Sequence, residues 1–224
     1  MIERDEIVAV VHRYVERHPD EREHLRPLLG QLDADLPITD RSSYPGHLTC
    51  SALVVDDDGR MLRIWHNVFG KWLQPGGHLE PADTSLVGVS LRELAEETGV
   101  VLDAAALLGS ETSETGDTRE SGAPLDIDVH AIPANRDKRE AKHYHFDLRY
   151  AFRLPAAAEV TLQWEEVSGF KWTPIDEIRS PRIAAKLCSA LRRTATRIAA
   201  SAQPPVPRDR GRIGEARDLV DDDA

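Results

Sequence analysis

Cysteine, positive charge and long apolar runs are all scarce in this sequence. Its two cysteines, Cys50 and Cys188, are too few for a disulfide framework and stand outside any His/Cys spacing typical of a zinc site, which predicts a reducing compartment. Lys and Arg number 28 against 39 Asp and Glu, and the formal charge of -11 argues against a general nucleic-acid-binding protein.

Membrane-directed segments are missing as well. No stretch approaches the roughly 20 apolar residues that cross a bilayer. The sequence begins Met-Ile-Glu-Arg-Asp-Glu, without a basic segment followed by an apolar core. The chain has no internal repeats and no P-loop. We therefore expect a cytoplasmic protein with neither nucleic-acid nor membrane partners.

What the sequence does have is a dense acidic segment between Gly76 and Val100. Its second half predicts a helix on which Glu93, Glu96 and Glu97 share one face, because positions i, i+3 and i+4 are neighbours. An apolar stripe for docking on a sheet lies on a different side, at Val87, Leu91 and Leu94. Gly99 then supplies the residue type that commonly ends a helix.

Three carboxylates on one helical turn repel one another by a few tenths of a kcal/mol per pair in an isolated helix. Arg92 relieves only part of this repulsion, by pairing with Glu96 at i, i+4. A hard divalent cation such as Mg²⁺ or Mn²⁺ would remove it, since carboxylate oxygens suit these ions. The plainer alternative is a solvated acidic helix surface. The two glycines before the helix and Gly99 after it favour the metal site.

This segment resembles the Nudix box, which reads Gly, five residues, Glu, seven residues, and then Arg-Glu-apolar-x-Glu-Glu-x-Gly-apolar. The second half matches at every defined position: Arg92, Glu93, Leu94, Glu96, Glu97, Gly99 and Val100. The first half departs twice, because the gap after Gly77 ends on Asp83 and eight residues separate Asp83 from Arg92. The departures leave the role of Asp83 open and keep the three glutamates in register.

The resemblance implies several properties. The fold would be an α/β/α sandwich around a mixed β-sheet. Glu93, Glu96 and Glu97 would be metal ligands, together with a backbone carbonyl from Gly76 or Gly77, although these glycines are also explained by the turn alone. An acidic residue on a later loop, Glu165 or Glu166, would be a further ligand or general base, with a plain surface acid as the alternative. Arg92 would orient Glu96.

The chain divides into three predicted parts: a helical hairpin at 1–40, a Nudix domain at 44–201, and a disordered tail at 202–224 that is rich in proline and charge. Apolar spacing predicts the hairpin helices at 3–18 and 20–33, as a packing or homodimerisation element or, less favoured, a substrate contact. Strands are predicted near 47–56, 60–65, 101–108 and 167–172, a functional or floppy loop at 109–122, and a helix from Asp176 to about 200 that Thr173 or Pro174 begins.

Two further segments alternate with period two, which predicts strands at 125–132 and 142–154. Their polar face is rich in His and Asp, and resembles a bacterial Nudix subgroup with Asp-x-Asp-x-His and His-x-His-x-Asp-x-Arg strands. That resemblance extends over about residues 44–175. We predict a wall that contacts substrate or a second metal, with a solvated sheet edge as the alternative; its residues are Asp128, His130, His143, His145, Asp147 and Arg149.

The resemblance implies a metal-dependent pyrophosphohydrolase acting on a small-molecule nucleotide. Glu96, Glu165 and Glu166 are candidates to accept the proton of the attacking water. The markers of ADP-ribose and dinucleoside polyphosphate enzymes are missing after the box, which favours a nucleoside triphosphate or a modified nucleotide. The alternatives are a non-catalytic nucleotide sensor, disfavoured by the retained glutamates, and an isoprenyl diphosphate isomerase, which would need Cys50 in the pocket.

Overall fold

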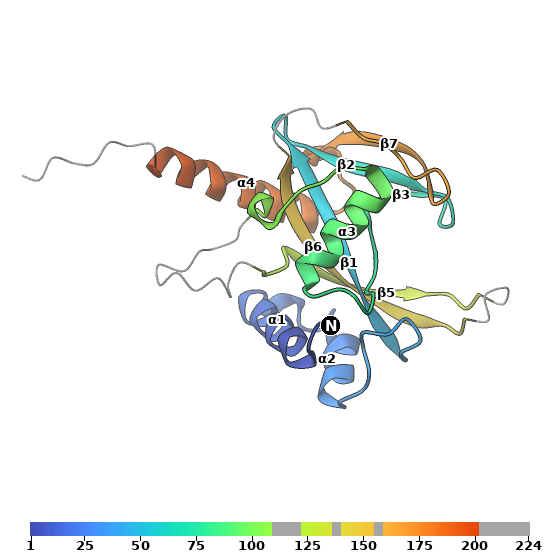
Figure 1. Cartoon of the computed structure of the whole chain (residues 1–224). Helices are drawn as coiled ribbons and strands as arrows, with labels where there is room; N and C mark the ends of the chain where they lie inside the picture. Colours follow the sequence, from blue (N-terminus) through green and yellow to red (C-terminus); the bar gives the residue numbers. More distant parts are fainter. Residues whose placement is uncertain (109–121, 136–139, 155–158, 202–224) are drawn as a thin grey trace, which may run out of the picture.

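A computed structural model describes residues 1–108, 122–135, 140–154 and 159–201, with side chains described as far as 196. In that part of the chain, seven strands form one mixed sheet in the order β3-β2-β1-β6-β5, with β4 beside β1 and β7 beside β2 (Figure 1). Along the chain the strands are β1 (Gly46–Asp56), β2 (Arg60–His66), β3 (Lys71–Leu73), β4 (Gly76–His78), β5 (Asp126–Ile132), β6 (His143–Leu154) and β7 (Val167–Pro174).

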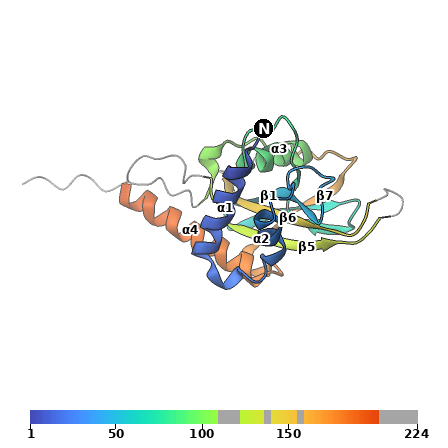
Figure 2. The ribbon, with the colours of Figure 1, turned by 90° about the horizontal axis from the view of Figure 1, so that it is seen from below.

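Helices cover both faces of the sheet. Helix α3 (Leu86–Thr98) lies on one face and α4 (Pro181–Ser201) on the other, as the view from below shows (Figure 2). The alternation of β1 explains both contacts, since successive side chains of a strand point to opposite faces. Leu48, Cys50, Ala52 and Val54 share one apolar cluster with α3, whereas Leu53 and Val55 share another with Ile183 and Leu187 of α4. The predicted α/β/α sandwich is confirmed.

The N-terminal helical hairpin is also present, as α1 (Arg4–Arg17) and α2 (Arg26–Asp33), joined through a single 3-10 turn at Pro19–Glu21. Its buried side chains, which include Ile7, Val11 and Leu28, belong to the same apolar cluster as Phe146 and Leu148 of β6. Gln31 fixes the start of β1, because its side chain accepts from the Gly46 N–H at 3.0 Å and donates to the Gly46 carbonyl at 2.7 Å. Among the described residues, no helix is both long and apolar enough to cross a membrane.

Three local predictions were wrong. The second hairpin helix begins at Arg26, not near 20, with Pro27 in its first turn, where the missing N–H of proline costs nothing. Residues 104–106 form a 3-10 turn rather than a strand, because the Asp103 carboxylate accepts the Ala105 N–H at 2.9 Å and draws the backbone out of the ladder. Leu107 keeps a single bridge to Phe152.

The third wrong prediction concerns the C-terminal helix, which begins at Pro181 rather than at Thr173, Pro174 or Asp176. Proline favours the first helical position, and Ile175–Glu177 form a separate 3-10 turn ahead of it. The predicted loop at 109–122, apart from Gly122, and the predicted tail at 202–224 lie outside the described residues.

Candidate active site

Helix α3 has well-defined ends that fix the position of its acidic face. The Ser85 hydroxyl accepts the Gly88 N–H at 3.1 Å, which caps the first turn. Gly99 has a φ of 67°, and its N–H donates to the Ala95 carbonyl at 2.9 Å. This left-handed residue favours glycine and confirms the predicted end of the helix. Leu94 is fully buried, so the opposite side of the helix is held against the sheet.

The three glutamates of α3 differ in exposure. Glu97 is 2% exposed and accepts the Gly76 N–H at 2.9 Å through Oε2. The Glu93 side chain is 13% exposed and lies against Gly77, where an added Cβ would stand 2.5 Å from Glu93 Oε1. The Glu96 side chain is 53% exposed. Two of the carboxylates therefore lie against the glycines of β4, where the sequence allowed for a turn, and the third faces solvent.

Arg92 of α3 contacts both β4 and the loop that follows it. Its Nε and Nη2 each lie 3.1 Å from an oxygen of Asp83, and Nη2 also donates to the His78 carbonyl at 2.8 Å. Nη1 donates to Glu93 at 3.0 Å and to Glu96 at 2.9 Å, the contact on which its predicted orienting role depends. Asp83, whose role the sequence left open, is 9% exposed and anchors the guanidinium.

The acidic cluster carries more negative charge than Arg92 can balance. Burial raises the pKa of Glu93 to about 7, and Glu96 and Glu166 add to the rise while Arg92 opposes it. Burial also raises the pKa of Glu97 to about 8, against the hydrogen bond from Gly76 and together with the charges of Glu93 and Glu166. Glu166, on the exposed loop before β7, is thus close enough to act on both buried carboxylates. Cations are the natural complement of such a cluster.

These residues fit a hard divalent cation. Glu93, Glu96 and Glu97 offer only oxygen donors, which Mg²⁺ and Mn²⁺ prefer. The glycine at 77 leaves the space beside Glu93 open, since any larger residue would fill it. Glu97 and Glu93 carry raised pKa values that a bound cation would lower again. Donor chemistry, space and charge agree.

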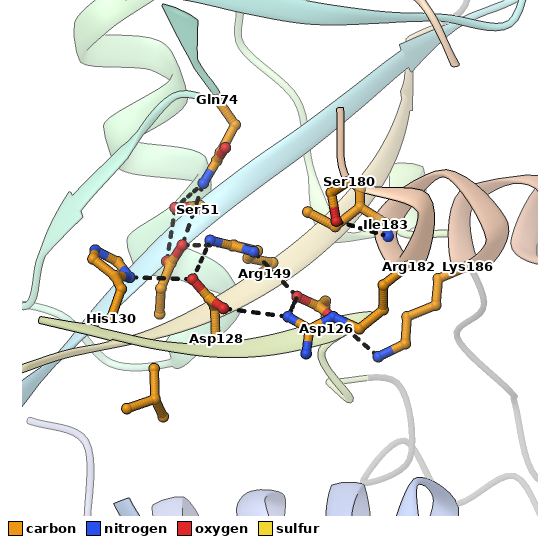
Figure 3. A network of polar contacts seen from close by, with 12 residues as sticks. Ser51, Gln74, Asp126, Asp128, His130, Arg149, Ser180, Arg182, Ile183 and Lys186 are labelled. Atoms are coloured by element: carbon orange, nitrogen blue, oxygen red, sulfur yellow. Dashed lines mark hydrogen bonds and ion pairs between the residues drawn. The ribbon is translucent and has the colours of Figure 1, made fainter. Parts of the chain in front are cut away.

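A second polar cluster lies on β5 and β6, where the substrate wall was predicted (Figure 3). Arg149 is at its centre, 2.8 Å from Asp147, 3.2 Å from Asp126 and 2.9 Å from Asp128. The Arg149 side chain is 11% exposed, and these three carboxylates engage all of its nitrogens. The structure thus brings Asp128, Asp147 and Arg149 together. Both carboxylates have further partners, such as His130 for Asp128 and Ser51 for Asp147.

Helix α4 contributes two cations to this cluster that the sequence reasoning missed. Arg182 lies 3.1 Å from Asp126 and Lys186 lies 2.8 Å from the same carboxylate, and Figure 3 shows both reaching down from the helix. Lys186 also lies 2.5 Å from Glu21 of the N-terminal hairpin. Their spacing at i, i+4 was the available signal, because it places two cations on one helical face. We interpret the cluster as a clamp between hairpin, sheet and α4.

The comparison with known families can now be made. The family model of the NUDIX domain matches residues 45–193, more than half of the chain. The chain belongs to the Nudix family. The match covers the acidic turn, its helix and all seven strands.

Individual relatives are partial matches. A probable DHNTP pyrophosphohydrolase from Lactococcus lactis subsp. cremoris is 32% identical over 127 residues, which are 57% of this chain and 60% of that protein. Phosphatase NudJ from Escherichia coli K12 is 48% identical over 59 residues, which are 25% of this chain and 37% of NudJ. The chain therefore spans less than two thirds of the length of these relatives. A MutT NUDIX hydrolase structure from Burkholderia pseudomallei is 23% identical with a TM-score of 0.43, covering 61% of this chain and 93% of that one.

The remaining predicted residues of this Nudix domain lie near the two clusters. His143 and His145 lie among other imidazoles rather than against carboxylates, with ring centroids 5.2 Å apart. His130 bridges the groups, 3.2 Å from Asp128 and with its ring centroid 5.5 Å from that of His145. Cys50 is fully buried in the apolar cluster beneath α3, and burial raises the pKa of its thiol well above the usual value. The isomerase alternative, which needs this thiol in a pocket, loses its support.

Proposed function

We propose that the protein is a Mg²⁺- or Mn²⁺-dependent pyrophosphohydrolase that cleaves a phosphoanhydride bond in a nucleoside diphosphate-linked substrate. The observation that carries this proposal is the acidic turn of α3. There Glu93 and Glu97 are buried against the glycines of β4, and both have raised pKa values. Arg92 is the neighbouring cation. A cluster with this excess charge is suited to a divalent cation.

Glu93, Glu96 and Glu97 are the proposed metal ligands, with a backbone carbonyl of Gly77 as a further candidate. The bound cation would supply charge neutralisation for the phosphate oxygens and a more acidic water. The Gly76 N–H holds the Glu97 carboxylate in place, and Gly77 keeps the space beside Glu93 clear. Arg92 fixes the orientation of Glu93 and Glu96 while Asp83 anchors the guanidinium.

The attacking water needs a carboxylate to accept its proton. Of the three candidates Glu96, Glu165 and Glu166, we favour Glu96 and Glu166, because both are exposed and the charge of each raises the pKa values of the buried pair. Replacing each by Gln separates them. The variant that lacks the true base should have a lower kcat and a KM close to that of the wild-type protein. Its profile of rate against pH should also lose the fall in rate at low pH.

The proposed substrate class is a nucleoside triphosphate or a modified nucleotide. The relative from Lactococcus lactis is named as a probable DHNTP pyrophosphohydrolase, which supports pyrophosphohydrolysis as the reaction. The predicted wall of Asp128, His130, His143, His145, Asp147 and Arg149 remains a proposal for substrate binding. Because Arg149 is already surrounded by carboxylates, we expect its effect on substrate to be indirect.

A panel assay tests the function. Purified protein with Mg²⁺ or Mn²⁺ is incubated with nucleoside triphosphates, oxidised nucleotides, dihydroneopterin triphosphate, ADP-ribose and dinucleoside polyphosphates, and released pyrophosphate and monophosphates are measured. Turnover of one class that is lost in Glu97→Gln supports the proposal. Metal-dependent thermal stabilisation by a nucleotide without any product would favour a sensor instead and contradict it.

A further inference from the structure

Three histidines from three different strands meet at one place on the sheet. They are His47 of β1, His78 of β4 and His145 of β6, and one ring nitrogen from each lies within 4.8 Å of the other two. The ring centroids of His47 and His145 are 4.9 Å apart, and those of His78 and His145 are 5.1 Å apart. None of the three belongs to the acidic turn of α3.

The sheet register creates this meeting. His47 is directly opposite His145 in the parallel pairing of β1 with β6, and His78 is opposite Thr49, one side-chain step from His47. His78 follows Gly77, and a Cβ added at Gly77 would point toward Glu93. Successive residues of a strand face opposite ways, so the imidazoles and the carboxylates lie on opposite sides of β4. The two sets of donors are neighbours but separate.

Ring nitrogens in this cluster lack partners. His47 is 2% exposed, and neither of its ring nitrogens makes a hydrogen bond within the described residues. The backbone of Ser43 lies near the His47 ring and raises the pKa of His47, against the larger lowering by burial and by His143. The Nε2 atom of His78 is buried and unpartnered as well. Buried polar atoms are rarely left so, and this observation points to a ligand that the three rings share.

We propose that His47, His78 and His145 form a binding site for a divalent transition-metal ion of the Zn²⁺ type, separate from the hard-cation site on α3. Imidazole is a preferred ligand of such ions, whereas Mg²⁺ prefers oxygen. Tetrahedral coordination at 2.0–2.1 Å requires nitrogens about 3.4 Å apart, so small side-chain movements close the present triangle. Three protein ligands leave a fourth position for water or a substrate atom.

The surroundings favour an uncharged cluster. Burial lowers the pKa of His78 to about 4 and that of His145 to about 2, and it also lowers that of His47. The rings are therefore neutral near pH 7, which is the form that binds a metal. The nearby cation Arg41 is 3.1 Å from Glu140, which offsets its repulsion of a metal ion. His143 stacks on His47, with ring centroids 4.9 Å apart, and its Nδ1 donates to the Ala141 carbonyl at 2.8 Å, so it forms a wall of the site.

Zinc binding in the presence of excess Mg²⁺ tests the proposal. The full chain, freed of any histidine tag and stripped with chelator, is titrated with Zn²⁺ while millimolar Mg²⁺ saturates the carboxylates. We expect one tightly held Zn²⁺ per chain, and X-ray absorption of that sample should show imidazole scattering. His78→Ala and His145→Ala should each weaken binding by at least about 100-fold, since even loss of an outer partner costs 10–100-fold.

Two control variants make the result decisive. Glu97→Gln removes an α3 carboxylate and should leave Zn²⁺ binding unchanged, and His130→Ala removes a neighbouring imidazole outside the set of three and should do the same. Loss of binding in Glu97→Gln but not in His78→Ala would place the zinc on α3 and overturn the proposal. Equal losses of zinc affinity in His78→Ala and His130→Ala would also overturn it. So would an X-ray absorption spectrum of the wild-type protein that shows only oxygen ligands, a measurement that does not depend on the folding of any variant.

Discussion

Two clusters of three carboxylates lie in the described part of the chain, and they differ in how their charge is balanced. On α3, the guanidinium of Arg92 pairs with Glu93 and Glu96, whereas the Glu97 carboxylate accepts the Gly76 N–H. On β5 and β6, Asp126, Asp128 and Asp147 surround Arg149, and Asp126 also pairs with two cations from α4. Both clusters are largely buried, so the difference lies in the number of cations.

The pKa values follow that difference. Burial raises the pKa of Glu93 to about 7 and that of Glu97 to about 8. Burial also acts to raise the pKa of Asp128, but the hydrogen bond from His130 and the charge of Arg149 hold it well below the usual range. A buried carboxylate without enough cations is poised to bind one, whereas a balanced set holds the fold together. Similar residue types therefore serve different ends.

The largest expected effect is that of Glu97→Gln. Loss of a metal-binding carboxylate should lower kcat by about 1000-fold, since a metal supplies several kcal/mol of charge stabilisation. Stability of the metal-free protein should rise by on the order of 1–3 kcal/mol near pH 7, because Gln is spared the cost of ionisation. Steady-state kinetics and denaturant unfolding in chelator measure the two. A variant that is both active and less stable would contradict the contrast.

Asp126→Asn should do the opposite. The carboxylate is fully buried between Arg149, Arg182 and Lys186, so its loss should cost about 3 kcal/mol of unfolding free energy, the scale for breaking a buried ion pair. We expect kcat per folded molecule to stay within a few-fold. Asp35→Asn, at a highly exposed ion pair with Arg4, is the matched control and should change stability little. Unchanged stability in Asp126→Asn would show that this cluster is not a clamp.

Gly77→Ala should impair catalysis with little change in the fold. The added Cβ would stand 2.5 Å from Glu93 Oε1 and displace the carboxylate. Misplacement by about 1 Å costs up to about 100-fold in rate. Gly30→Ala is the control, since an added Cβ there meets nothing within 4 Å. Equal kcat values for the two variants would argue that the space beside Glu93 has no catalytic role.

The smallest expected effect is on the pH dependence of stability. Burial raises the pKa of Glu93 to about 7 and that of Glu97 to about 8 in the folded protein. The stability that the protonated groups contribute is therefore fully present below their pKa values in the unfolded chain, and it is lost as pH rises through 7 and 8. The free energy of unfolding of the metal-free protein should fall by on the order of 1–2 kcal/mol between pH 6 and pH 9. Saturating Mg²⁺ should abolish the trend; a trend that Mg²⁺ leaves intact would have another source.

The α3 cluster could be predicted because its information is local. Glu93, Glu96 and Glu97 lie within one helical turn, and Gly99 ends the helix where the sequence indicated. The strands β5 and β6, which carry Arg149 and its three carboxylate partners, were also predicted correctly from their alternation. The cations that α4 adds were not predicted, because Arg182 approaches Asp126 and Asp128 only once α4 folds across the sheet.

The histidine cluster shows the same limit more sharply. His47 and His145 are neighbours only because β1 and β6 pair in parallel, a pairing that joins residues far apart along the chain. The spacing of His47 and His145 along the sequence does not indicate that register. The Asp83 contact with Arg92 likewise depends on the path of the loop between β4 and α3, which brings the two side chains together. Local periodicity predicts which residues share an element, and packing decides which elements meet.

The most direct test of the account is the number of protons released when Mg²⁺ binds. Calorimetric titration near pH 7.5, repeated in buffers of different ionisation enthalpy, gives this number for wild-type, Glu97→Gln and Asp126→Asn proteins. The account predicts release of up to about one proton in wild-type and Asp126→Asn, because the cation displaces protons from carboxylates with raised pKa values, and little release with weakened binding in Glu97→Gln. Mg²⁺ binding that releases no protons and survives Glu97→Gln unchanged would contradict it.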